Sequence, residues 1–277
     1  MFATASLARR IERAEAGLVA GAVRAAARRV PPDQLILREF NGGVAAYVEP
    51  GTPFNKVVGL GFEGIPEPET FDRLEKDFAG RRSPLHVEVS TLADPALVRM
   101  LTRRGYELVG FENVLGIDPR TVSEGRPVAP DIAVLPAERH EADAWIDAVA
   151  TGFLTPDVSD GPPPHEEFGR EVLERIYRDT VAAPGFERFL ARRGGVIAGG
   201  ASFRIQDGVA QLAGAATLPD HRRQGVQTAL LRYRLAEAAR RGCDVAVVTT
   251  LPGSKSQENV QKAGFALLYV RAILVKG

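Results

Sequence analysis

The sequence predicts an α/β protein built as two tandem copies of one unit, each a mixed central sheet flanked by helices. Strand-like and helix-like runs follow the same order in the two halves of the 277-residue chain. The run 243–250 is almost continuously apolar, which is typical of a strand buried on both faces in a parallel pairing. Gly105-Tyr106 and Gly264-Phe265 each follow a predicted helix and open the last strands of their half. These observations together indicate a mixed, α+β type of sheet in each half.

A segment without periodicity separates the two copies. Residues 118–130 contain three prolines and show neither a helical nor a strand pattern. We therefore expect a first domain at 1–118, a linker at 119–130 and a second domain at 131–277.

The composition excludes several classes of function. Lys+Arg and Asp+Glu both total 35, so no overall basic field would attract nucleic acid. No apolar run approaches the roughly 20 residues that span a bilayer. Glu12 and Glu15 argue against an N-terminal transit peptide, because such peptides avoid acids. The single cysteine, Cys243, excludes an internal disulfide and favours a reducing, cytoplasmic compartment.

The first half is expected to begin with a helix within residues 1–30, with Ser6 as its cap. Strands at 35–40, 44–48 and 55–62, a helix at 66–78, a strand at 84–90 and a helix from 94 should follow. Two last strands are expected within residues 105–117.

The second half repeats this order. A strand at 131–136 leads to helices at 140–154 and 165–182. Hairpins should turn at Gly194-Gly195 and at Asp207-Gly208, since both pairs tolerate positive φ. The long helix that follows should be closed by Gly242, and a helix and a closing pair of strands should lie within 254–275.

The chemistry is expected where the strand 212–218 breaks at Pro219 and a short polar loop opens the next helix. The first turn of a helix has N–H groups without internal partners, and the macrodipole adds positive charge there. Gly225 permits close approach of a ligand to the backbone, while Arg222 and Arg223 add positive charge. The loop is therefore suited to bind a phosphate-bearing ligand.

The run Arg222-Arg223-Gln224-Gly225-Val226-Gln227 resembles the R/Q-x-x-G-x-G/A signature of the GNAT superfamily of acyl-CoA-dependent N-acyltransferases. Gln227 departs from the usual Gly or Ala. The resemblance covers residues 131–277 well, and the first half only by the order of its elements. It implies two tandem GNAT-like domains, of which the second binds acetyl-CoA.

The resemblance also implies which residues bind the cofactor. In this family the strand before the signature splays from the next parallel strand, and the pantetheine arm of coenzyme A enters the gap. The residues so implicated are Ala216, Thr217, Leu218, Arg222, Arg223, Gln224, Gly225, Val226, Gln227, Thr228 and Asn259. For Thr217 and Leu218 the alternative is ordinary strand packing, and no metal is implied.

The matching place in the first half carries acids instead. Glu63, Glu67 and Glu69 cluster at the start of the helix predicted at 66–78. Carboxylates stabilise a helix start but repel a pyrophosphate there. We therefore expect a degenerate first copy that does not bind coenzyme A.

The proton donor is not evident. Many family members place Tyr four residues before the Gly-Phe pair, and this position is Val260 here; the usual Asn seven residues earlier is Gly253. Ser254, Ser256 and His165 are weak candidates for catalysis, and capping of the next helix is an equal alternative for Ser254. Other single residues are read structurally, with His221, Cys243 and Trp145 expected to pack rather than react.

The loop between the two helices of the second half is acidic, with Asp157, Asp160 and Glu166 before the first cation at Arg170. Such a loop would concentrate a cationic amine. The alternative is that prolines and acids simply start a helix.

The leading interpretation is an N-acetyltransferase that moves acetyl from acetyl-CoA to a small primary amine by direct transfer. A non-catalytic acyl-CoA-binding or regulatory module is the alternative, since the usual Tyr and Asn are missing. A third class, tandem-domain relatives that transfer aminoacyl groups from tRNA, is disfavoured by the zero net charge. The acceptor, the acyl length and whether the chain forms a homodimer stay open.

Overall fold

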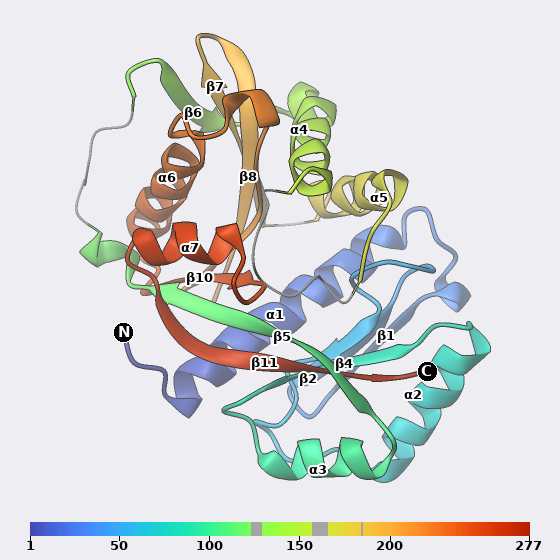
Figure 1. Ribbon diagram of the computed structural model, residues 1–277. Coiled ribbons are helices and arrows are strands. Elements are labelled where there is room, and N and C mark those ends of the chain that lie inside the picture. Colours follow the sequence, from blue (N-terminus) through green and yellow to red (C-terminus); the bar gives the residue numbers. More distant parts are fainter. Residues whose placement is uncertain (123–128, 157–165, 184) are drawn as a thin grey trace.

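The computed structural model describes residues 1–122, 129–156, 166–183 and 185–277. They form one continuous sheet of 11 strands in the order β1-β2-β3-β4-β11-β5-β10-β9-β8-β7-β6. Helices cover both faces of this sheet, and the long helix α1 crosses behind its middle (Figure 1). The α/β fold class with a mixed central sheet is confirmed.

The first half contains three helices and five strands within the described residues. The helices are α1 (Ala5–Ala26), α2 (Pro68–Gly80) and α3 (Pro95–Arg103). The strands are β1 (Ile36–Phe40), β2 (Gly43–Tyr47), β3 (Lys56–Val58), β4 (Leu85–Ser90) and β5 (Glu107–Ile117). Pairing is antiparallel except between β3 and β4, which are parallel and joined through α2.

The second half has the same order after an additional strand, β6, and with two helices where the first half has α1. Its helices are α4 (Ala142–Leu154), α5 (Arg170–Val181), α6 (Val226–Arg240) and α7 (Lys255–Lys262). Its strands are β6 (Ile132–Pro136), β7 (Phe186–Arg193), β8 (Val196–Gln206), β9 (Val209–Thr217), β10 (Val245–Thr250) and β11 (Ala266–Lys276). Strands β9 and β10 are parallel and joined through α6, as β3 and β4 are through α2.

The two halves exchange their last strands. β11, from the end of the chain, pairs with β4 of the first half, whereas β5 pairs with β10 of the second half. β5 and β11 also pair with each other along most of their length, so they join two half-sheets into one. Each half therefore completes its sheet with a strand of the other. The division into domains at 1–118 and 131–277 stays a prediction.

Helix α1 lies on the face of the sheet that also carries α4 and α5. Ala8, Ile11 and Ala14 pack with Val209 and Val245 of the second half. The buried Glu12 accepts hydrogen bonds from Tyr269 Oη at 2.7 Å and from Arg271 Nε at 2.8 Å. Burial raises the pKa of Glu12, and the Arg271 guanidinium opposes that shift. α1 is thus anchored to β11 by a buried polar cluster as well as by apolar packing.

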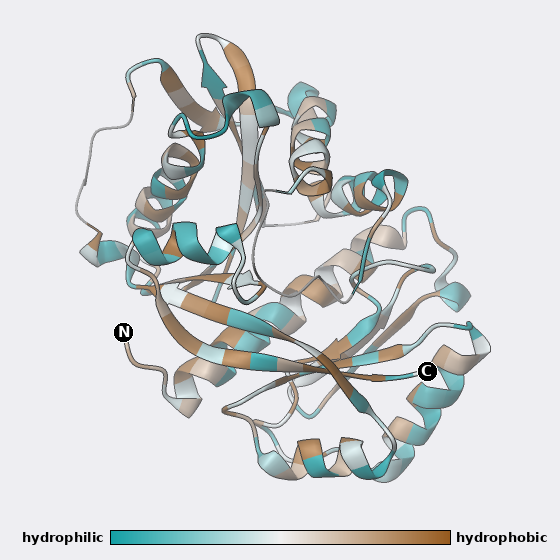
Figure 2. Ribbon diagram, viewed as in Figure 1, coloured by the Kyte–Doolittle hydropathy of each residue, from teal (hydrophilic) through white to brown (hydrophobic). Residues whose placement is uncertain are grey.

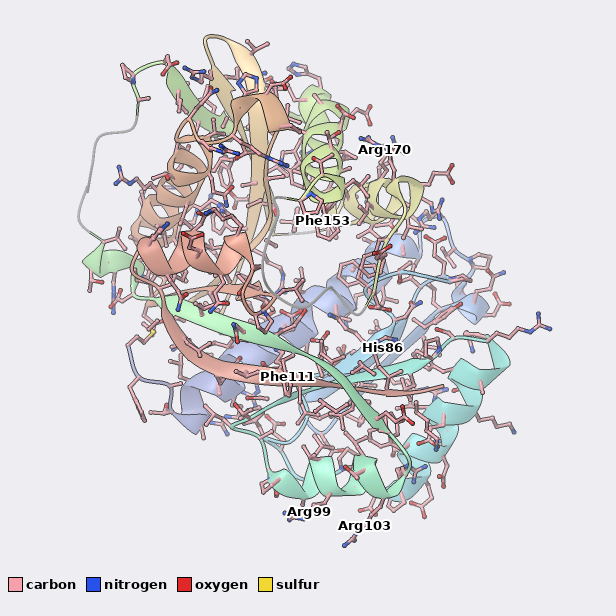
Figure 3. All side chains as sticks on the ribbon, in the orientation of Figure 1. His86, Arg99, Arg103, Phe111, Phe153 and Arg170 are labelled. Carbon is pink, nitrogen blue, oxygen red and sulfur yellow. The ribbon has the colours of Figure 1, made fainter. Side chains whose placement is uncertain are left out.

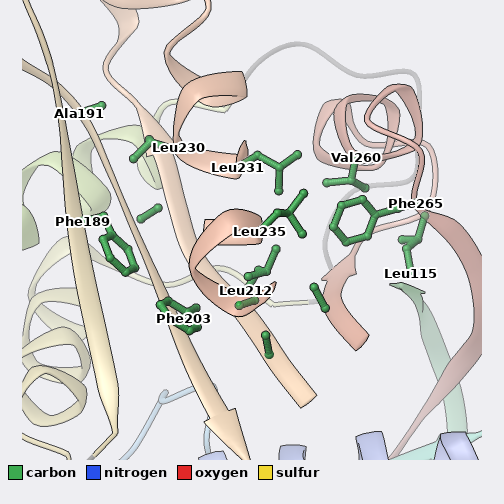
Figure 4. Packing of buried hydrophobic residues seen from close by; sticks show 14 of the residues in the cluster. Leu115, Phe189, Ala191, Phe203, Leu212, Leu230, Leu231, Leu235, Val260 and Phe265 are labelled. Atoms are coloured by element: carbon green, nitrogen blue, oxygen red, sulfur yellow. The ribbon is translucent and has the colours of Figure 1, made fainter. Parts of the chain in front are cut away.

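The opposite face of the sheet carries α2, α3, α6 and α7. The core of the first half lies under α2 and α3 and includes Phe71, Phe78 and Leu97. The core of the second half lies between α6, α7 and the strands, and Figure 4 shows Leu230, Leu235 and Phe265 within it. Hydrophobic and hydrophilic bands alternate along β5 and β11 in Figure 2, because successive side chains of a strand point to opposite faces of the sheet.

Several sequence-based expectations are corrected in detail. Thr4, not Ser6, caps α1, because its side chain accepts from the N–H of Leu7. The last strands expected as pairs are single long strands, β5 and β11, which the exchange between halves leaves unbroken by turns. α5 begins at Arg170, later than expected. The turns at 194–195 and 207–208 are confirmed, and all four residues have positive φ.

None of the helices in the described residues combines the length and the apolar character that a membrane span requires.

Candidate functional site

The parallel strands β9 and β10 diverge after a short contact. Their register covers only Val209↔Val245, Ala210↔Ala246 and Gln211↔Val247. Beyond these pairs, β9 continues against β8 and β10 continues against β5. Backbone groups that face the other strand are thereby released from the parallel ladder. The two strands therefore diverge towards their C-terminal ends, as the sequence resemblance implied, and we call this divergence the V-shaped opening.

A β-bulge lies in β9 beside this opening. The register passes from Ser202↔Ala213 to Gly200↔Ala216, so Gly214 and Ala215 face the single residue Ala201. Gly214 has φ +53°, and a Cβ there would lie 3.1 Å from Ser202 Oγ. A bulge bends its strand and increases the local twist, which turns the end of β9 away from β10.

Arg234 of α6 holds the bulge from the inside. Its side chain is 2% exposed, and its Nη1 donates to the carbonyl of Ser202 at 3.0 Å and to that of Ala213 at 3.4 Å. Ser202 Oγ donates to the same Ala213 carbonyl at 2.9 Å. Desolvation lowers the pKa of Arg234 to about 9. Arg234 thus ties α6, the helix that begins after Gly225, directly to β9, the strand that diverges from β10.

The loop after β9 leads into α6 through Gly225. Gly225 is the N-cap residue of α6 with φ +90°, and no side chain caps this helix. A Cβ at Gly225 would make only an ordinary van der Waals contact, with Ile132 Cδ1 at 3.6 Å, so no atom of the described residues crowds this position. Arg223 is exposed and also has a positive φ, of 58°. The geometry therefore leaves the first N–H groups of α6 available to an anion.

Two predicted cofactor residues are held by other parts of the protein. Arg222 Nε donates to the carbonyl of Thr217 at 3.4 Å, and its Nη2 donates to the carbonyl and hydroxyl of Thr155. Gln224 accepts from Arg193 and donates to the carbonyl of Asp220 at 3.3 Å. Arg222 therefore ties the end of α4 to the end of β9 beside the loop.

The remaining predicted cofactor residues, except Asn259, lie at the end of β9 or in the first turn of α6. Ala216 is buried, and it packs so closely on α4 that a Cβ on Gly152 would lie 2.4 Å from Ala216 Cβ. The N–H of Leu218 donates to the carbonyl of Ala198 at 3.0 Å. Val226 is buried, Thr228 is exposed, and Thr217, Gln227 and Asn259 are half-buried. Asn259 lies in α7, across the opening from α6.

Two buried hydroxyls end the diverging strands without a hydrogen-bond partner among the described residues. They belong to Thr217, the last residue of β9, and Thr250, the last residue of β10. Buried polar groups in native proteins are usually paired, so these two hydroxyls are available to a ligand atom. Their position fits the binding of an elongated polar molecule such as the pantetheine arm.

The weak candidates for catalysis fare differently. Ser254 is the N-cap of α7 and accepts from the N–H of Gln257 at 3.2 Å, which favours the capping alternative. Ser256 is exposed, and His165 lies outside the described residues. Val260 is buried in the core with Leu115 and Phe265, as Figure 4 shows, and its side chain has no proton to donate.

The acidic loop is described only in part. Asp157 and Asp160 lie outside the described residues, whereas Glu166 Oε1 is 3.5 Å from His86 Nε2 of β4. Burial lowers the pKa of His86. Figure 3 shows His86 on the sheet below α5, which places the end of the α4–α5 connection over the first half.

Further titratable side chains gather on the α1 face of the sheet near His86. Lys56 Nζ donates to Glu88 Oε1 at 2.7 Å. Arg271 Nη1 lies 3.7 Å from Glu112 Oε2, and Arg271 Nη2 lies 3.6 Å from Glu15 Oε2. Burial, together with the neighbouring Glu88, raises the pKa of Glu112 to about 7. Sequence reasoning missed this cluster, because its members come from α1, β3, β4, β5 and β11.

The expectation that Trp145 and Cys243 pack in the interior is met, whereas that for His221 stays a prediction. Trp145 is fully buried and donates to the carbonyl of Ala201 at 3.0 Å. Cys243 is buried as well, and burial raises the pKa of its thiol. His221 is half-buried in the turn before the loop.

Two surface hollows lie elsewhere. One is lined by Thr4, Arg10 and Asp244 at the start of α1, next to the N-terminal end of β10. The other is lined by Gln34, Tyr47 and Arg81 in the first half. Neither adjoins the V-shaped opening, which is defined by the strand register.

Comparison with known proteins supports the interpretation of the second half. Residues 155–265 match the model of the Acetyltransferase (GNAT) family. No curated protein sequence matches the chain.

Solved structures share the fold across most of the chain. A GCN5-related N-acetyltransferase from Kribbella flavida is 19% identical, with a TM-score of 0.65 over 94% of this chain and 95% of that one. A tandem GNAT protein from the clavulanic acid biosynthesis pathway is 16% identical, with a TM-score of 0.61 over 92% and 87%. A functionally unknown conserved protein from Staphylococcus epidermidis is 11% identical, with a TM-score of 0.59 over 86% and 92%. At these identities the likeness concerns the fold alone.

Proposed function

Since residues 155–265 match the GNAT acetyltransferase family and the chain has a tandem GNAT fold, we propose that this protein is an acetyl-CoA-dependent N-acetyltransferase. The observation that carries the proposal is the V-shaped opening between β9 and β10, which leads directly to the uncapped start of α6. An acyl-CoA molecule has a long polar arm for the opening and a pyrophosphate for the helix start.

The residues of the second half divide the binding of acetyl-CoA between them. The backbone from Arg223 to Thr228 binds the pyrophosphate, and Gly225 lets it approach. Backbone groups of Ala216, Thr217 and Leu218 line the pantetheine arm. Asn259 faces the cofactor from α7. These assignments rest on the loop geometry and on the two unpaired hydroxyls of Thr217 and Thr250.

The proposed reaction is direct transfer within a ternary complex. The amine attacks the thioester carbonyl, and positioning of the two partners supplies most of the rate enhancement. A covalent intermediate would need an activated nucleophile. Cys243, the one thiol of the chain, is fully buried, and burial disfavours its thiolate.

The proposed acceptor is a small cationic amine. Glu166 lies on the face of the sheet that carries α1, α4 and α5, opposite the α6 and α7 side. Burial lowers the pKa of the His86 imidazole beside it, so this imidazole is neutral at neutral pH. In E166Q the amine KM should rise while the acetyl-CoA KM is unchanged, and the effect should shrink as ionic strength rises. E167Q, at the exposed neighbouring position, is the control.

The alternative is a non-catalytic acyl-CoA-binding module, and the buried Val260 favours it, because the usual tyrosine is missing there. The two functions differ in one measurement. The purified chain is incubated with acetyl-CoA and a panel of primary amines, and free thiol is recorded. Amine-dependent thiol release supports the transferase. Saturable binding of acetyl-CoA without release for any amine supports the binding module.

A further inference from the structure

We propose that the hydroxyl of Thr250 binds the sulfur of coenzyme A and stabilises the leaving thiolate, a role that Val260 cannot take. This inference rests on the proposed acetyltransferase function and assigns a donor that the sequence did not reveal.

The position of Thr250 along the opening is the first support. It lies three residues beyond Val247, the last residue of β10 that pairs with β9. Gly214 lies three residues beyond Gln211, the partner of Val247, and it forms the bulge. Thr250 and the bulge therefore lie at the same level on opposite sides of the opening. Thr217 lies further out, towards the loop and the start of α6.

The face on which Thr250 lies is the second support. Along a strand, side chains alternate between the two faces of the sheet. Val245 and Val247 pack against α1, whereas Ala246 and Val248 pack in the core beneath α6 and α7. Thr250 shares the second face, the one to which Val260 also belongs. A tyrosine on α7 and a threonine on β10 can thus serve the same region.

The unpaired hydroxyl is the third support. Thr250 is 5% exposed, and its Oγ1 has no hydrogen-bond partner in the described part of the chain. An unpaired buried hydroxyl lowers stability, so a ligand atom is its natural partner. The neighbouring Thr249 differs, because its Oγ1 accepts from Arg271 Nη1 at 3.4 Å on the other face.

The proposed acetyl transfer forms one carbon–nitrogen bond and breaks one carbon–sulfur bond. The amine nitrogen bonds to the thioester carbonyl carbon, the carbon–sulfur bond breaks, and sulfur keeps the electron pair. The cationic amine loses two protons to water, one before the attack, which frees its lone pair, and one as the amide forms. Thr250 keeps its own proton and donates a hydrogen bond to the developing thiolate, which is a charge-assisted bond and stronger than a neutral one.

The first test is T250V, which removes the hydroxyl and keeps the shape. We expect kcat to fall about 10- to 100-fold, the range of a single donor to developing charge, while the acetyl-CoA KM changes less than about twofold. The thermal midpoint should stay equal or rise, because an unpaired hydroxyl is replaced by a methyl group. T250S should restore most of kcat, and T249V should leave it unchanged.

A second test needs no acceptor. Thiolate absorbance of bound coenzyme A is titrated in the wild type and in T250V. Loss of the donor should raise the pKa of the bound thiol by about one unit, which is a tenfold change in ionisation. Equal thiol pKa values, or an unchanged kcat in T250V, would overturn the inference. If the wild-type chain binds no coenzyme A, the proposed function itself is wrong, a separate outcome.

Discussion

The two halves of the molecule have the same parallel strand–helix–strand unit, yet only one of them is open. In the second half β9 and β10 separate, and the loop after β9 ends in Gly225, where a Cβ would meet no atom closer than 3.6 Å. In the first half the loop after β3 is joined to the loop after β4, because the N–H of Asp94 donates to the carbonyl of Gly61 at 2.8 Å. A Cβ on Gly61 would lie only 2.7 Å from Ala93 Cβ, so these loops leave no gap between them.

The first residues of α2 and α6 also differ in charge. Glu67 is the N-cap residue of α2, where Gly225 is that of α6. Glu63, in the loop before α2, is paired with Arg13 of α1. A carboxylate at a helix start competes with a phosphate for the same partial charge. The comparison shows that the same unit has a tight loop contact and an acidic helix start in the first half, and we therefore expect only the second half to bind coenzyme A.

The largest expected effect comes from closing the open half. G225E should weaken acetyl-CoA binding at least about 100-fold, because it places bulk and negative charge at the start of α6. G225A tests the backbone alone: the space accepts a methyl group, but φ +90° costs roughly 1–2 kcal/mol. Calorimetry on the full chain is the measurement.

The same calorimetric titration also tests whether the first half binds coenzyme A. We expect one coenzyme A per chain, and E67G in the first half should not add a second. Two equivalents in the wild type would contradict the closed state of the first half. The intact chain is required, because a fragment that ends at Asp118 lacks β11, the partner of β4 and β5.

The next effect concerns the bulge in β9, in the second half. R234M removes the donor to the carbonyls of Ser202 and Ala213. We expect kcat/KM to fall about tenfold, because small shifts of a positioning element are costly. Stability should change by less than about 2 kcal/mol, since loss of a buried charge offsets the lost hydrogen bonds. R240M, on the exposed end of α6, is the control, and equal kinetics in both variants would contradict a positioning role.

A pH-dependent effect is expected at the joint between the halves. The pKa of Glu112 is raised to about 7, so the folded state favours its neutral form. That contribution to stability is complete below about pH 4.5 and is lost as pH rises through 7. E112Q should therefore stabilise the protein by about 1–3 kcal/mol at pH 8 and little at pH 5.

Denaturant unfolding at the two pH values measures this difference. E107Q, at an exposed position on the same strand, is the control. An equal gain for E112Q at pH 5 and pH 8 would show that burial of the carboxylate is not its cause.

The smallest effect is expected at the thiol. C243S should keep most of the transferase activity, because the thiol is fully buried and takes no part in direct transfer. A hydroxyl at this apolar position should cost roughly 1–2 kcal/mol of stability. Mass spectrometry after incubation with acetyl-CoA should show no acetyl adduct; an adduct that C243S abolishes would overturn direct transfer.

The sequence by itself determined what short stretches encode. The apolar run at 243–250, the hairpin turns and the loop that ends in Gly225 each depend on periodicity or turn chemistry within about ten residues. The structure has the strand β10, the turns and the αL glycine at these places. The acids near the start of α2 are likewise visible in the chain: Glu67 at the N-cap and Glu69 in the first turn agree with the expectation, whereas Glu63 lies in the preceding loop and pairs with Arg13.

Only the tertiary structure decided what depends on distant partners. The exchange of β5 and β11 is a matter of pairing, and both strands would satisfy their hydrogen bonds equally well within their own half. The bulge at Gly214 depends on the register with β8, and the role of Arg234 depends on that bulge. The hydroxyl of Thr250 became a candidate donor only because no described neighbour pairs with it. Local preference therefore fixes the elements, while long-range pairing decides which polar groups are left for a ligand.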